Sequence, residues 1–203
     1  MQIICKTVGM LAANCYIVRN SEEAVVIDPG GNPEVIYPYI EDRRLSMVIN
    51  THGHYDHIAA NNDLKSRYDT KLACSSLDAE MLLDPDQNLS AMVGTPYISV
   101  APDLLLKHGD SLRIGDETLK VILTPGHTVG SISILMGKAL FSGDTLFYRS
   151  VGRTDLPGGN FDVLRESITG RLYTLPDDTV VYTGHGDSTL IGDEKQYNEW
   201  VSL

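Results

Sequence analysis

The chain has 203 residues, 42% of them hydrophobic and 21% charged, which are the proportions of an ordinary globular protein. We expect one domain over residues 1–203 in the cytoplasm, because no stretch resembles a secretory signal or reaches the roughly 18 apolar residues of a membrane helix. The 16 Lys and Arg against 27 Asp and Glu give a net charge of −11. This charge disfavours nucleic acid as a partner, whereas a small anionic substrate remains compatible with it.

Three β-rich segments open the chain, and they predict antiparallel strands at residues 2–8, 14–19 and 24–27. The third strand ends at Asp28, which is either a turn residue or a hydrogen-bond partner of the histidine-rich loop described below. Asn32 as N-cap and Pro33 in the first turn predict a helix to about Arg43. Its expected inner face is Val35, Ile36, Tyr39 and Ile40. The three cysteines lie in apolar runs and predict buried free thiols: Cys5, Cys15 and Cys74.

A histidine-rich motif follows the next predicted strand, Ser46 to Asn50. The motif reads Thr51-His52-Gly53-His54-Tyr55-Asp56-His57 and sets three imidazoles and a carboxylate within six consecutive positions. A loop at the end of a buried strand would point these side chains into one site, with Gly53 allowing a tight bend. Four such ligands would crowd one metal ion, so the motif predicts two neighbouring ions.

The middle of the chain predicts alternating helices and strands. Residues 84–102 are rich in proline and polar residues, and we expect a mobile loop over the site there. His108 falls in a turn between two strands and is not expected to be a ligand. The predicted helices are 57–68 and 76–83, and the predicted strands are 71–74 and an antiparallel set at 104–106, 111–114 and 117–123.

Three later segments repeat one pattern, in which an apolar strand is followed by small residues and then by a potential ligand. The ligands that end these segments are His127, Asp144 and His185. Strand ends of a layered α/β fold share one rim of the sheet, so these residues are expected to converge with the histidine motif. Amphipathic helices are predicted at 161–175 and 194–201.

Together these motifs resemble the metallo-β-lactamase superfamily, over nearly the whole chain. The resemblance implies an α/β (α+β) four-layer αββα sandwich with two divalent ions at the sheet rim, zinc in the first place and iron or manganese as alternatives. Carried over, His52, His54 and His127 would hold one ion. Asp56, His57 and His185 would hold the other, and Asp144 would bridge both.

Within the superfamily, four segments look most similar to short glyoxalase II-like hydrolases: 124–128, 143–147, 150–155 and 189–192. This resemblance implies cleavage of a thioester such as S-lactoylglutathione by a metal-bridging hydroxide, with Asp56 as the catalytic carboxylate. We expect no C-terminal helical substrate domain. Arg153 is expected either to contact a substrate carboxylate or to pair with Asp144 or Asp155, and Tyr148 is a second substrate-side candidate.

Other functions remain open from the sequence. Persulfide dioxygenases of the superfamily also carry Gly-Arg-Thr-Asp, here residues 152–155, and use one iron on residues corresponding to His52, His127 and Asp144. A lactonase and a non-catalytic metal-binding module are further alternatives. Hydrolysis of β-lactams is not expected, because Asp144 stands where the antibiotic-degrading enzymes carry a cysteine.

Overall fold

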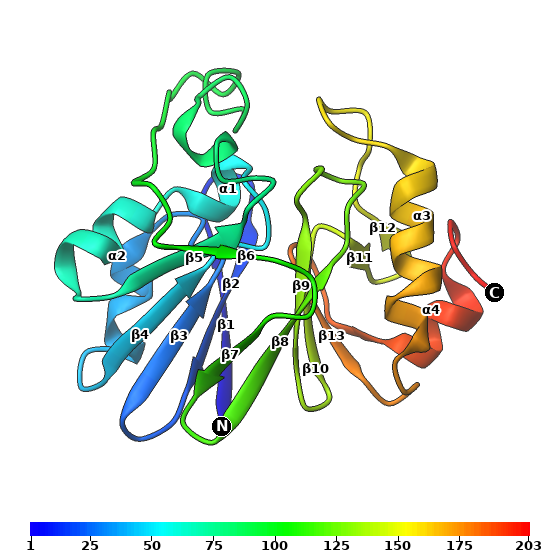
Figure 1. Ribbon diagram of the computed structural model, residues 1–203, viewed down its shortest axis with the longest axis horizontal. Helices are drawn as coiled ribbons and strands as arrows, with labels where there is room; N and C mark the ends of the chain where they lie inside the picture. The colour runs from blue at the N-terminus through cyan, green and yellow to red at the C-terminus, as the bar shows by residue number, and fades with distance from the viewer.

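Two six-stranded sheets lie face to face in the middle of the molecule, and helices cover the outer side of each (Figure 1). The computed structural model describes all of residues 1–203. The first sheet has the strand order β1-β2-β3-β4-β5-β6, and the second has the order β14-β13-β10-β9-β8-β7. This arrangement confirms the expected four-layer αββα sandwich. None of the helices has the length and apolarity that crossing a membrane requires.

The first half of the chain forms one sheet and its helices. Its strands are β1 (Gln2–Val8), β2 (Ala13–Arg19), β3 (Glu23–Ile27), β4 (Arg44–Ile49), β5 (Lys71–Ser75) and β6 (Leu104–Leu106). Its helices are η1 (Pro33–Val35), η2 (Tyr37–Tyr39), α1 (Tyr55–Ile58), α2 (Asn61–Arg67) and η3 (Met81–Leu83), where η marks a 3-10 helix.

The second half repeats the plan. Its strands are β7 (Ser111–Ile114), β8 (Glu117–Leu123), β9 (Ile132–Met136), β10 (Ala139–Gly143), β13 (Val180–Thr183) and β14 (Thr189–Leu190), with a separate hairpin of β11 (Leu146–Phe147) and β12 (Ser150–Val151). Its helices are α3 (Phe161–Gly170), η4 (Leu172–Thr174) and α4 (Ile191–Tyr197).

Three apolar layers hold the sandwich together, and strand periodicity explains them. Successive side chains of β2 point to opposite faces, so Ile17 packs against the outer helices while Val18 packs between the two sheets. The third layer lies between the second sheet and α3, where Leu164 and Ile168 are fully buried. Because both faces of each sheet are covered, the central strands read as continuous apolar runs.

The helix predicted from Pro33 to about Arg43 is absent, and two 3-10 turns take its place. Pro38 explains the difference, because proline has no N–H to donate and disfavours helical geometry in the residue before it. Asn32 is not a helix cap: its backbone is left-handed, and its Oδ1 accepts from the N–H of Gly9 at 2.9 Å. Of the expected inner face, Ile36 and Ile40 are buried, whereas Val35 is exposed.

Other segments also differ from prediction. The strand at 104–106 pairs parallel with β5 in the first sheet, because the chain crosses between the sheets before β7. The helix predicted at 57–68 is interrupted between α1 and α2, and 76–83 forms turns and η3. Helix α3 ends at Gly170, earlier than expected, and helix α4 begins at Ile191, also earlier than expected. Cys15 and Cys74 are buried free thiols, but Cys5 is exposed.

Candidate metal centre

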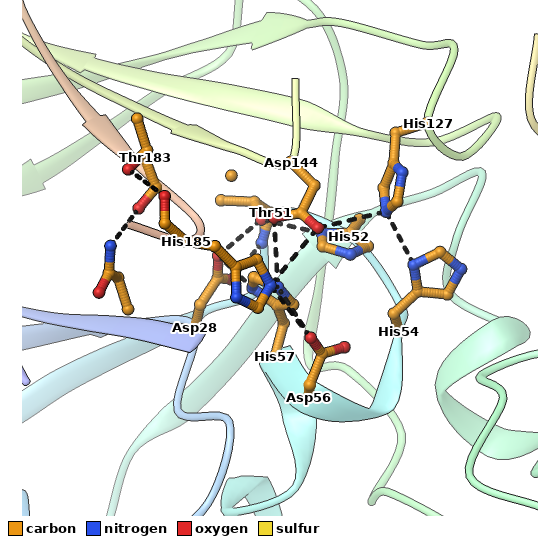
Figure 2. Close-up of polar contacts among 12 residues, drawn as sticks. Asp28, Thr51, His52, His54, Asp56, His57, His127, Asp144, Thr183 and His185 are labelled. Carbon is orange, nitrogen blue, oxygen red and sulfur yellow. Dashed lines mark hydrogen bonds and ion pairs between the residues drawn. The ribbon is translucent and has the colours of Figure 1, made fainter. Parts of the chain in front are cut away.

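The histidine motif lies where strand β4 runs into helix α1. His52 and His54 are on the connecting loop, and Asp56 and His57 lie within α1. Asn50 joins loop and helix, because its Nδ2 donates to the backbone oxygen of His57 at 3.1 Å. The motif therefore forms a short loop and one helical turn that present their side chains at the edge of the sandwich (Figure 2).

The remaining candidate ligands follow three strands of the second sheet. His127 comes after β8, Asp144 directly follows β10, and His185 comes after β13. Strands β8 and β10 each run antiparallel to β9, and β13 runs parallel to β10, so all three end at the same edge. The ends of β4, β8, β10 and β13 therefore converge, as the sequence predicted.

At this edge the seven side chains gather in one cluster (Figure 2). His54 Nδ1 is 2.9 Å from His127 Nε2, and His57 Nε2 is 3.3 Å from His185 Nε2. Asp144 reaches both pairs, with Oδ2 at 3.5 Å from His127 Nε2 and Oδ1 at 3.4 Å from His57 Nε2. Three sets have potential ligand atoms within 4.8 Å of one another: His52, His54 and His127; His52, His57 and Asp144; and Asp56, His57 and His185.

Hydrogen bonds behind the rings determine which nitrogen is available at the centre. His127 Nδ1 donates to the backbone oxygen of Arg153 at 2.7 Å, so Nε2 is the atom that can bind a metal. His57 Nδ1 donates to Asp28 Oδ2 at 3.0 Å. Asp28 also accepts from the N–H of Thr51 at 2.7 Å and from its hydroxyl at 2.6 Å. Of the two roles considered for Asp28, the structure therefore shows the hydrogen-bonding one.

The electrostatics of the centre suit a cation. His52 Nε2, His54 Nε2 and Asp144 Oδ1 are buried and make no hydrogen bond. Burial lowers the pKa of His52 well below its usual value and that of His54 to about 3, so both rings are neutral at pH 7. Burial opposes ionisation of Asp144, but the neighbouring histidines, His57 first, lower its pKa well below its usual range. Neutral imidazoles and carboxylates are donors that zinc, iron and manganese accept, so these residues fit divalent ions.

Comparison with known protein families agrees with this geometry. The sequence profile described as "Metallo-beta-lactamase superfamily" matches residues 8–185, a span that contains all the candidate ligands. The chain belongs to the metallo-β-lactamase superfamily.

Relatives in this superfamily include two whose names state a function. The probable metallo-hydrolase YqgX of Bacillus subtilis is 34% identical over 96% of this chain and 95% of its own length. The hydroxyacylglutathione hydrolase GloC of Haemophilus influenzae is 34% identical over 93% of this chain and 92% of its own length. Both cover nearly the whole chain, so the metallo-hydrolase relationship extends beyond the motifs.

Solved structures of the superfamily have the same fold. BLEG-1, described as a B3 metallo-β-lactamase, has a TM-score of 0.93 and 35% identity, with 100% of both chains covered. TTHA1623 in a di-iron-bound form has a TM-score of 0.84 and 33% identity over 97% of this chain and 98% of its own. ETHE1 from Myxococcus xanthus has a TM-score of 0.83 and 33% identity over 100% of this chain and 85% of its own.

Two glycines of this superfamily member leave room for Asp144. A Cβ on Gly184 would lie 2.1 Å from Asp144 Oδ1, and a Cβ on Gly152 would lie 1.8 Å from the backbone oxygen of Asp144. Any larger residue would displace the carboxylate or its backbone. Glycine at these two positions therefore lets the neighbouring backbone approach the centre closely.

Asp78 connects the loops that carry His54 and His127. Its Oδ2 accepts from the N–H of Gly53 at 3.1 Å and from the hydroxyl of Thr128 at 2.7 Å, and its Oδ1 accepts from the N–H of Gly130 at 2.8 Å. Burial raises the pKa of this carboxyl, and the three hydrogen bonds oppose that rise. The sequence did not reveal this role, because the nearest of these partners lies 25 residues away along the chain.

Replacing Asp78 by alanine is expected to lower the free energy of unfolding by about 2–5 kcal/mol, because each buried donor left without an acceptor costs roughly 1–3 kcal/mol. Urea unfolding of the metal-loaded protein measures the change. The matched control is Asp69→Ala, at an exposed aspartate, with an expected change within about 0.5 kcal/mol. Equal unfolding curves for the Asp78 variant and the wild type would contradict the proposed connection.

A cavity of about 560 Å³ opens directly onto the metal centre. Asn88, Leu89, Met92 and Val93 line it, so the segment expected over the site does lie there, while its mobility stays a prediction. The full lining is Leu11, His54, Tyr55, Asp56, Asn88, Leu89, Met92, Val93, His127, Asp144, Phe147, Ser150, Val151, Arg153, Leu156 and His185.

The two substrate-side candidates have different outcomes. Arg153 lines the cavity, and its guanidinium pairs with the carboxylate of Asp155. Its Nε donates to Oδ1 and its Nη2 donates to Oδ2, each at 2.8 Å. Tyr148 does not line the cavity: it is 53% exposed, and the guanidinium of Arg149 lies over its ring. The aromatic side chain that lines the cavity is that of Phe147. The hairpin explains this exchange, since Phe147 ends strand β11 whereas Tyr148 lies in the turn that joins β11 to β12.

Proposed function

We propose that this chain is a metal-dependent thioesterase of the glyoxalase II type. The observation that carries the proposal is that nitrogen and carboxylate donors from four strand ends meet in one centre at the floor of a substrate-sized cavity. The 34% identity with a hydroxyacylglutathione hydrolase over most of both chains supports it. The similarity to a di-iron-bound structure supports a centre for two ions, although iron in that protein leaves zinc and manganese as alternatives here.

The proposed ligands follow from the geometry. His52, His54 and His127 would hold one ion, Asp56, His57 and His185 the other, and Asp144 would reach both. Two divalent cations held there would lower the pKa of a bound water and would polarise the carbonyl of the substrate.

Asp56 is the residue proposed to orient the attacking water. It lines the cavity, and its Oδ2 is 3.2 Å from His185 Nε2. Burial would raise its pKa, but His57 and His185 lower it overall, so the side chain is a carboxylate that accepts a hydrogen bond. In the reaction the water oxygen forms the new C–O bond and the C–S electron pair leaves on sulfur. The thiolate departs without a proton, and the protons released from water and acid pass to solvent.

The test combines elemental analysis with an assay of thiol release from S-lactoylglutathione and simpler thioesters. We expect about two ions per chain and metal-dependent hydrolysis, with loss of activity after chelation and recovery when metal is restored. Metal-replete protein that cleaves no thioester, ester or lactone would overturn the proposal.

Persulfide oxidation is the second candidate, favoured by the sequence Gly152-Arg153-Thr154-Asp155, which resembles the corresponding segment of persulfide dioxygenases. One iron per chain and oxygen uptake with glutathione persulfide would support it over hydrolysis.

A chromogenic cephalosporin should be tested alongside the thioesters, because BLEG-1 is described as a β-lactamase and is 35% identical. We expect no cleavage of that compound.

A further inference from the structure

The cavity over the metal centre has a polar floor and apolar walls. The candidate ligands form the floor, and the walls are Leu11, Leu89, Met92, Val93, Phe147 and Leu156. At the rim Met92 is 74% exposed and Leu11 is 53% exposed. Apolar side chains that stay in contact with water around a cavity gain free energy when an apolar ligand covers them. The walls therefore suit an uncharged, apolar arm of a substrate.

The cavity offers one positively charged side chain apart from the histidines, Arg153. The Nε and Nη2 atoms of its guanidinium donate to the two carboxylate oxygens of Asp155. The side chain of Arg153 is 62% exposed and that of Asp155 is 68% exposed. Arginine grips a carboxylate through this same fork. A substrate carboxylate that uses the same edge of the guanidinium has to displace Asp155, and one that binds the remaining N–H groups meets an ion pair whose net charge is zero.

Charge elsewhere does not offset this competition. The Arg153–Asp155 pair has no net charge, and the chain as a whole carries −11. The smaller cavity of about 400 Å³ beside Tyr55 and Asp56 has no lysine or arginine in its lining. An anionic substrate therefore meets no unpaired lysine or arginine in the lining of either cavity.

We propose that the site selects uncharged thioesters with an apolar arm, and that Asp155 disfavours anionic thioesters by occupying Arg153. This inference rests on the proposed thioesterase function and adds its substrate class. Asp155 would then determine specificity from outside the lining of the cavity, without touching the reacting atoms.

The first experiment compares two thioesters that share one acyl group. S-lactoylglutathione carries two carboxylates, and S-lactoyl-N-acetylcysteamine is uncharged. We expect the higher kcat/KM for the uncharged compound. Within an uncharged acetyl, butanoyl and hexanoyl series, KM should fall by roughly three- to fourfold per methylene until the chain fills the cavity. A kcat/KM for S-lactoylglutathione equal to or higher than that for the uncharged compound would overturn the proposal.

The second experiment frees the arginine. Asp155→Asn is expected to lower KM for S-lactoylglutathione by about three- to fivefold at low salt, with little change for the uncharged thioester. The matched control is Asp178→Asn, which removes the same charge from the exposed Lys138–Asp178 pair. Adding Arg153→Gln to Asp155→Asn should abolish the gain. An unchanged ratio of the two KM values in Asp155→Asn would overturn the role of Asp155.

Calorimetry with thioethers separates this inference from the proposed function. S-hexylglutathione and S-hexyl-N-acetylcysteamine cannot be hydrolysed, so their binding to metal-loaded protein is measurable even in a protein without thioesterase activity. Tighter binding of the uncharged thioether, with a gain for the glutathione compound in Asp155→Asn, supports the selectivity. Tighter binding of S-hexylglutathione by wild-type protein contradicts it, whatever the activity assay gives.

Discussion

Replacing Asp144 by alanine is expected to lower thioester hydrolysis by about 10³-fold or more and to reduce the metal content of the protein. Its carboxylate lies 3.4–3.6 Å from His57, His127 and His185, so it contacts side chains of both proposed ligand sets. Metal ions contribute several kcal/mol to transition-state stabilisation, and each 1.36 kcal/mol is about tenfold in rate. Elemental analysis and kcat/KM for the uncharged thioester measure the two effects.

Two further variants make the Asp144 result specific. Asp144→Asn keeps the shape of the side chain and loses its charge, so an effect shared with alanine assigns the loss to the carboxylate. Asp187→Ala removes an exposed aspartate two residues beyond His185 and should leave metal content and activity unchanged. An alanine variant at Asp144 with wild-type metal content and activity would contradict the proposed centre.

Replacing Asp28 by alanine is expected to weaken metal binding or lower kcat/KM by about 10- to 100-fold, the usual effect of removing a hydrogen-bond partner of a ligating histidine. Asp28 is 1% exposed and accepts from His57 and twice from Thr51. Loss of these bonds should also lower the free energy of unfolding by about 2–5 kcal/mol. Titration with a competing chelator and urea unfolding measure the two effects separately.

The backbone at Asp28 calls for a second variant, because its φ is 53°. Asparagine adopts this left-handed conformation readily, whereas alanine is strained there. Asp28→Asn should therefore spare part of the stability while weakening metal binding, because an amide carries no charge to support the His57 ring. Metal affinity of the alanine variant within twofold of wild type would refute the positioning role of Asp28.

The candidate ligands were predictable because their evidence is local. Four of them lie in the motif that follows β4. Asp144 and His185 follow β10 and β13 closely, and His127 follows β8 after three small or turn-forming residues. Strand ends in a layered fold share an edge, so local pattern was enough to predict their convergence. The helix predicted after Pro33 failed where a local signal was overlooked, since Pro38 already argues against it.

The sequence by itself determined the type of fold, the superfamily and the set of candidate metal ligands, because donor chemistry and strand periodicity can be recognised from neighbouring residues. Only the tertiary structure decided which groups support that set: Asp28 reaches Thr51 across 23 residues, and Asp78 reaches Thr128 across 50. It also decided that β6 joins the first sheet and that Phe147, rather than Tyr148, faces the cavity. These contacts depend on how two sheets and their loops pack against each other, and that packing is the sum of many weak, long-range interactions that no single segment specifies.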